Sequence, residues 1–78
     1  MNRTMSRDET HLQSWLAQAA SLDRERLKVA VNKSMQRLTV WCRGSITDDE
    51  RDCIVQTGLV WSSQFGRTWI VNVKDGGE

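Results

Sequence analysis

Two capping boxes constrain this chain more than any other feature of its sequence. Each is a hydroxyl residue followed three positions later by a glutamate, in Ser6–Glu9 and again in Thr47–Glu50. In this motif the hydroxyl oxygen accepts a hydrogen bond from the third backbone amide of a helix, and the glutamate reaches back to the amide of the capping residue. The sequence therefore predicts that one helix begins at about residue 7 and another at about residue 47.

The first helix is expected to span residues 7–20. After its cap, apolar residues recur at the spacing of one helix face, namely Leu12, Trp15, Leu16 and Ala19. The second box is expected to open a short helix that ends at Gly58, because glycine is favoured in the left-handed position that follows a helix.

Between these two helices, a further helix is expected from Asp23 to at least Gln36. Acidic residues suit its amino end, and an apolar stripe follows at Leu27, Val31, Met35 and Leu38. Together with the first helix it would form an antiparallel helical hairpin. Residues 38–42 are rich in β-branched and aromatic side chains, so they are compatible with a continued helix and equally with a short strand.

A β-hairpin is expected near the carboxyl end. Two runs of strand-forming residues, 59–63 and 68–73, flank the turn Gln64–Arg67. The predicted fold class is therefore α+β, with an N-terminal helical hairpin, a short third helix and a C-terminal antiparallel β-hairpin of two or three strands. We expect one domain over residues 6–74, a disordered start over residues 1–5 and a flexible tail over residues 75–78.

Composition narrows the classes of function. The chain has 78 residues and a formal net charge of +1, which gives no overall field directed at nucleic acid or membrane. Its longest apolar runs are a few residues long, whereas a membrane span needs about 20, and its start lacks the apolar segment of a secretory signal. Two cysteines are too few for a disulfide framework, so we expect a cytoplasmic protein with reduced thiols.

Motifs for catalysis or metal binding are absent from the sequence. Cys42, Cys53 and His11 do not have the spacing of a zinc site, and no phosphate-binding glycine loop or nucleophile motif occurs. The acids at the second box suit a helix start, where the dipole favours negative charge. We therefore expect a non-enzymatic protein with no metal and no cofactor.

The leading hypothesis is that the protein binds another protein as an adaptor, inhibitor or regulator. Residues 1–43 hold eight bases and four acids, and residues 44–78 hold three bases and six acids, a segregation that can orient a partner. Phe65 lies in a turn, where polar residues are the rule, so an exposed ring there would anchor a partner. In the alternative, Phe65 packs on Trp61 or Trp69. The residues expected to bind the partner are Gln64, Phe65, Arg67, Asp48, Asp49 and Asp52.

Two other surfaces could serve protein binding. An edge of the small sheet would offer free backbone groups to a partner strand. Val29 and Val40, on one helix face beside Arg26 and Arg37, would form the seam of a homodimer.

The second hypothesis is nucleic-acid binding. A helix that leads through Gly58 into a hairpin with Gly66-Arg67 at its tip resembles winged-helix domains over about the last third of the chain. The resemblance implies a nucleic-acid-binding transcriptional regulator. Because acids open the corresponding helix and oppose contact with phosphates, binding would use Arg26, Lys33 and Arg37 on a basic helix face, together with Arg67.

Overall fold

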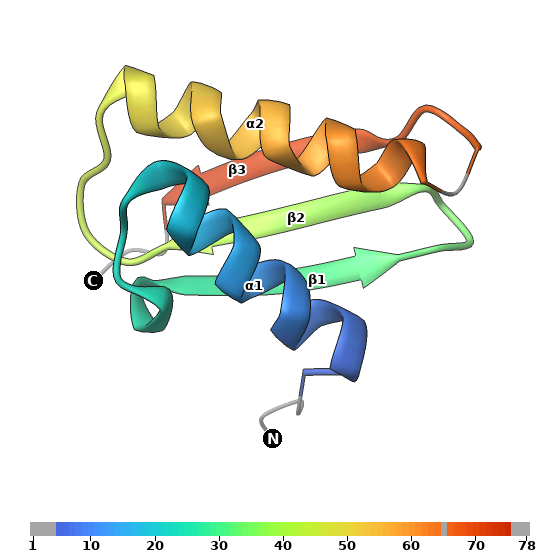
Figure 1. The fold of residues 1–78 in the computed structure, drawn as a ribbon, viewed down its shortest axis with the longest axis horizontal. Coiled ribbons are helices and arrows are strands. Elements are labelled where there is room, and N and C mark those ends of the chain that lie inside the picture. Colours follow the sequence, from blue (N-terminus) through green and yellow to red (C-terminus); the bar gives the residue numbers. More distant parts are fainter. Residues whose placement is uncertain (1–4, 65, 76–78) are drawn as a thin grey trace.

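The computed structural model describes residues 5–64 and 66–75, which form two layers (Figure 1). The order of elements is α1 (Arg7–Ala20), a short 3₁₀ turn η1 (Arg24–Arg26), β1 (Leu27–Asn32), β2 (Arg37–Cys42), α2 (Asp48–Ser63) and β3 (Ile70–Asp75). The class α+β is confirmed. The order α-β-β-α-β contradicts both the helical hairpin followed by a β-hairpin and the winged-helix order. Most of the expected disordered start and flexible tail lies outside the described residues.

Helix α1 confirms the prediction for residues 7–20. The Ser6 hydroxyl accepts a hydrogen bond from the Glu9 N–H at 3.2 Å, and a Glu9 carboxylate oxygen accepts one from the Ser6 N–H at 2.8 Å. The helix ends where Ser21 adopts a left-handed backbone conformation with φ 56°. Leu12 and Leu16 are fully buried in the core and Trp15 is half-buried, as their helical spacing predicts, whereas Ala19 is exposed.

Residues 27–36 form a strand and a turn, so the expected second helix is wrong. β1 and β2 pair antiparallel, from Leu27 opposite Cys42 to Asn32 opposite Arg37. The apolar stripe misled because a spacing of four residues places side chains on one face of a helix and also on one face of a strand. The alternative left open for residues 38–42 is resolved as strand.

Helix α2 begins at the predicted cap and is longer than expected. The Thr47 hydroxyl accepts from the Glu50 N–H at 3.1 Å, and the Glu50 carboxylate accepts from the Thr47 N–H at 2.8 Å. The helix then continues to Ser63. Its buried positions follow one helix face, Ile54, Gly58, Trp61 and Ser62.

Gly58 lies inside α2 and does not end it. A Cβ atom placed on this glycine would lie 2.9 Å from Leu38 Cδ2 and 3.1 Å from Val71 Cγ1. The helix therefore approaches β2 and β3 so closely here that only a glycine fits without displacement of its neighbours. The expected strand 59–63 is wrong, because these residues form the last part of the helix.

Strand β3 lies parallel to β2, so the expected C-terminal antiparallel hairpin is wrong as well. The pairing runs from Arg37 opposite Ile70 to Cys42 opposite Asp75. Parallel neighbours need a crossover connection, and α2 supplies it. The strand expected over residues 68–73 overlaps β3. It was expected to pair antiparallel with residues 59–63, whereas β3 pairs parallel with β2.

Both helices cover the same face of the sheet, whose strand order is β1-β2-β3 (Figure 1). The core lies between the two layers, and the strands supply Leu27, Val29, Leu38, Val40 and Cys42 to it. At one end Trp61 and Trp69 pack edge to face, with ring centroids 5.5 Å apart. No helix in the described part of the chain is long and apolar enough to cross a lipid bilayer.

Candidate functional site

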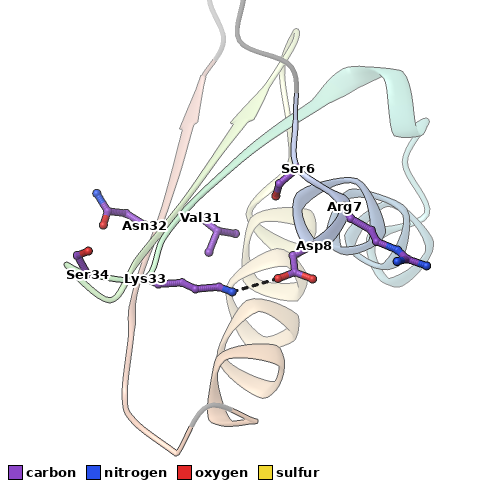
Figure 2. A pocket seen from close by; sticks show the side chains of 7 residues that line it. All are labelled: Ser6, Arg7, Asp8, Val31, Asn32, Lys33 and Ser34. Atoms are coloured by element: carbon purple, nitrogen blue, oxygen red, sulfur yellow. Dashed lines mark ion pairs between the residues drawn. The ribbon is translucent and has the colours of Figure 1, made fainter.

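The face of the sheet that points away from the helices carries nine side chains. Figure 2 shows the two sides of the sheet, with Val31 directed toward the helices and Asn32 away from them. Because successive residues of a strand alternate between faces, the pairing register fixes all nine. They form three rows across the strands: Lys28, Trp41 and Lys74; Ala30, Thr39 and Asn72; and Asn32, Arg37 and Ile70. We call these nine residues the open face.

The open face is positively charged. Lys28, Arg37 and Lys74 are all exposed, and none of the nine residues is acidic. None of these three cations forms an ion pair with a carboxylate among residues 5–64 and 66–75. A chain with a net charge of +1 thus concentrates three unopposed cations on one side. Such a surface attracts polyanions and orients them.

Trp41 lies at the centre of the first row, between Lys28 and Lys74. Adjacent strands are about 4.8 Å apart, so the backbones of the two lysines lie about 10 Å from each other with the indole between them. The ring is only half-buried, because it rests on the sheet without a helix above it. Ile70, in the third row, is 56% exposed.

The sequence indicated four residues for nucleic-acid binding, three on a basic helix face (Arg26, Lys33 and Arg37) and Arg67 at a hairpin tip; the structure has neither that helix nor that hairpin, so the arrangement is wrong. Arg26 holds the loop before α2, where its guanidinium donates to Arg43 O at 2.9 Å and to Ser45 O at 2.7 Å. Lys33 belongs to the β1–β2 turn and Arg67 to the connection between α2 and β3. Of the four, only Arg37 belongs to the open face.

A groove lies between the start of α1 and the β1–β2 turn (Figure 2). Lys33 and Asp8 form an ion pair across it, with Nζ 3.3 Å from a carboxylate oxygen. The two charges offset each other, and both side chains are more than half exposed. The groove is lined by Ser6, Arg7, Asp8, Val31, Asn32, Lys33 and Ser34, and with Arg7 beside the ion pair this lining has a net charge of only +1.

The residues indicated for protein binding are spread along α2 and the segment that follows it. Asp48, Asp49 and Asp52 lie exposed in its first turns. Gln64 caps its carboxyl end, about 18–24 Å from these acids at the 1.5 Å rise per residue of a helix. Phe65 lies outside the described residues. The structure thus separates the acidic residues from Gln64.

The expected homodimer seam is wrong. Val29 and Val40 are opposite each other in neighbouring strands, and their side chains are 1% and 0% exposed. They point into the core beneath the helices. Neither valine is available to a second copy of the chain.

Side chains from the helices cover parts of both sheet edges. On β1, the Glu9 carboxylate accepts from the Val31 N–H at 2.7 Å, and the Gln13 amide donates to Leu27 O at 2.6 Å. On β3, the Arg51 guanidinium donates to Val73 O at 2.9 Å. A partner strand would compete with these hydrogen bonds for the Leu27 carbonyl and the Val31 N–H of β1 and for the Val73 carbonyl of β3.

The two thiols differ in their surroundings. Cys42 is buried, and burial raises the pKa of its thiol despite the opposing effect of Arg26. Cys53 is exposed on α2. Among the described residues no group of three His, Cys, Asp or Glu side chains is placed to hold a metal ion.

Sequence reasoning missed Lys28, Trp41 and Lys74 as a group. The alternation of side chains along a strand could have placed these residues on one face. It could be applied only if residues 27–32 were predicted as a strand, and they were predicted as a helix. No protein-family model, no curated protein and no solved structure matches the chain.

Proposed function

We propose that the protein is a non-enzymatic binding module whose open face binds nucleic acid. The observation that carries the proposal is the set of three exposed cations, Lys28, Arg37 and Lys74, on a face that has no carboxylate. Contacts between cations and phosphates supply most of the affinity in binding that does not depend on sequence. The charge of the face is therefore complementary to a polyphosphate backbone.

The other groups of this face favour nucleic acid over an acidic protein. Trp41 offers an aromatic surface for a base, and Asn72 and Thr39 offer hydrogen-bonding groups beside it. An acidic peptide would also bind the cations, but its Asp and Glu side chains carry no ring that could stack on the indole. Protein binding through the acidic end of α2 remains a separate prediction.

Fluorescence anisotropy with a fluorescein-labelled oligonucleotide of twelve randomised positions tests the proposal. At about 50 mM salt we expect saturable binding. The double variant Lys28→Gln/Lys74→Gln is expected to bind about tenfold more weakly or worse. With three phosphates contacted, the logarithmic salt slope should be about −2, so affinity should fall about 20-fold between 50 and 200 mM salt.

The matched control is Arg7→Gln/Arg24→Gln, which removes the same charge from α1 and η1 on the helix side. It should bind almost as the parent chain does. An equal loss in both double variants would mean that net charge and not the open face governs binding, and would overturn the proposal. Absence of binding at about 100 µM protein, or equally effective competition by polyglutamate, would overturn it too.

A further inference from the structure

We infer that the open face binds a single strand, with one base stacked on Trp41 and the phosphates on either side of that nucleotide held by Lys28 and Lys74. This inference rests on the proposed function and specifies its ligand. The juxtaposition that carries it is one row of the sheet, in which a half-buried indole lies between two exposed lysines.

The row matches the repeating unit of a single strand. A nucleotide within a strand has a phosphate on each side of its base, and the row has a cation on each side of its ring. The lysine backbones lie about 10 Å apart, and their flexible stems let the ammonium groups adjust to the phosphates. The strand would therefore cross the sheet along the row, over β1, β2 and β3.

The neighbouring row leaves room for the base to lie flat. Ala30 and Thr39 are small, so on β1 and β2 this neighbouring row places no bulky side chain beside the indole. Asn72 completes this row on β3 with an amide that can both donate and accept hydrogen bonds at a base edge. In the third row, the planar guanidinium of Arg37 offers a second stacking surface.

A duplex does not suit the same face. In a duplex the bases stack on one another, so their flat surfaces are closed to Trp41. A major groove about 12 Å wide admits a helix or a two-stranded ribbon, whereas the open face belongs to a sheet of three strands. Only the phosphates of a duplex would be within reach, and the contribution of stacking to affinity would be lost.

Titration of the intrinsic tryptophan fluorescence tests the inference, with a single strand of twelve thymidines, its uridine counterpart in RNA and a blunt DNA duplex of mixed sequence. Both single strands are expected to quench the fluorescence, and to bind at least tenfold more tightly than the duplex at equal salt. Trp41→Ala should weaken single-strand binding about five- to a hundredfold. A preference above tenfold between the DNA and RNA strands would contradict an affinity that comes from stacking and phosphate contacts.

Trp15→Phe is the matched control for the fluorescence signal. Trp15 is half-buried like Trp41 but lies on α1, on the helix side of the sheet. Quenching should persist in Trp15→Phe and vanish in Trp41→Phe, which keeps an aromatic ring at the site. This comparison tests whether the ligand contacts Trp41 even where Trp41→Ala fails to fold.

Failure of the inference is distinguishable from failure of the proposed function. Equal binding of duplex and single strand, with lysine dependence but without quenching through Trp41, would overturn the inference and leave nucleic-acid binding intact. Absence of binding to all three oligonucleotides would overturn both.

Discussion

Glu9 links the start of α1 to the edge of the sheet. Its side chain is fully buried, and its carboxylate accepts from the Ser6 N–H at 2.8 Å and from the Val31 N–H at 2.7 Å. Glu9→Gln would present an amide NH₂ where one backbone N–H now finds an acceptor. We expect the free energy of unfolding to fall by about 2 kcal/mol, because a buried donor is left unsatisfied.

Urea denaturation measures this loss, and Asp8→Asn is the control. Asp8 precedes Glu9 and carries the same charge, but its ion pair with Lys33 is exposed to solvent. Such pairs contribute about 0–1 kcal/mol. Similar losses in the two variants would contradict the role assigned to Glu9.

The two thiols should differ in reactivity. The thiolate is the reacting form of cysteine, and burial both shields Cys42 and raises its pKa. At pH 8 a thiol-specific chromogenic reagent should therefore modify one thiol per chain rapidly and the second only after unfolding. The rapid phase should be absent from Cys53→Ser; two rapid thiols in the folded parent chain would contradict the burial of Cys42.

The raised pKa of Cys42 also gives a direction for stability against pH. The unfolded chain loses this thiol proton at the ordinary pKa of cysteine, below the pKa in the folded chain. The stabilising contribution is therefore complete at neutral pH and is lost as pH rises through the alkaline range. Chemical denaturation at a series of pH values should show a steeper alkaline decline for the parent chain than for Cys42→Ala.

At the level of elements, helix starts were predictable and the interior of the chain was not. Both capping boxes are local, since each is specified within four consecutive residues. The region 27–36 has no such signal. Its four-residue apolar spacing fits the periodicity of a helix and also that of a strand. Only the pairing of β1 with β2 shows that the segment is a strand.

Gly58 shows how tertiary packing overrides a local signal. Glycine is typical of a helix end, yet here it lets α2 approach Leu38 and Val71. Gly58→Val should lower the free energy of unfolding by about 2–3 kcal/mol, because added atoms overpack the contact between helix and sheet. Thermal or urea denaturation checks this value.

Gln56→Ala is the matched control on the same helix, since Gln56 is exposed. A surface change of this kind should alter stability by about 0.5 kcal/mol or less. A Gly58→Val variant as stable as the parent chain would show that α2 does not approach the sheet as closely as described.

At the scale of the whole molecule, the candidate site could not be found from the sequence because it has no local motif. Lys28, Arg37 and Lys74 lie on three different strands. They share a face only because β1 is antiparallel and β3 parallel to β2. The charge of Arg37 was enough to indicate it for nucleic-acid binding. The residues beside it on the open face follow from the strand register, which can be assigned only once the strands are known.

The same distribution of charge governs self-association through the open face. Two copies docked face to face would bring six cations together, and two unit charges 10 Å apart in water repel by about 0.4 kcal/mol. Each of the three cations on one copy would repel each of the three on the other. These nine repulsions oppose the dimerisation that burial of Trp41 and Ile70 would favour. Sedimentation velocity at low salt should therefore show a monomer. Lys28→Gln/Lys74→Gln should dimerise more readily than the parent chain, because it keeps the apolar groups of the open face and loses most of the repulsion. A parent chain that dimerises through the open face at low salt would contradict the proposal that this face binds a polyanion.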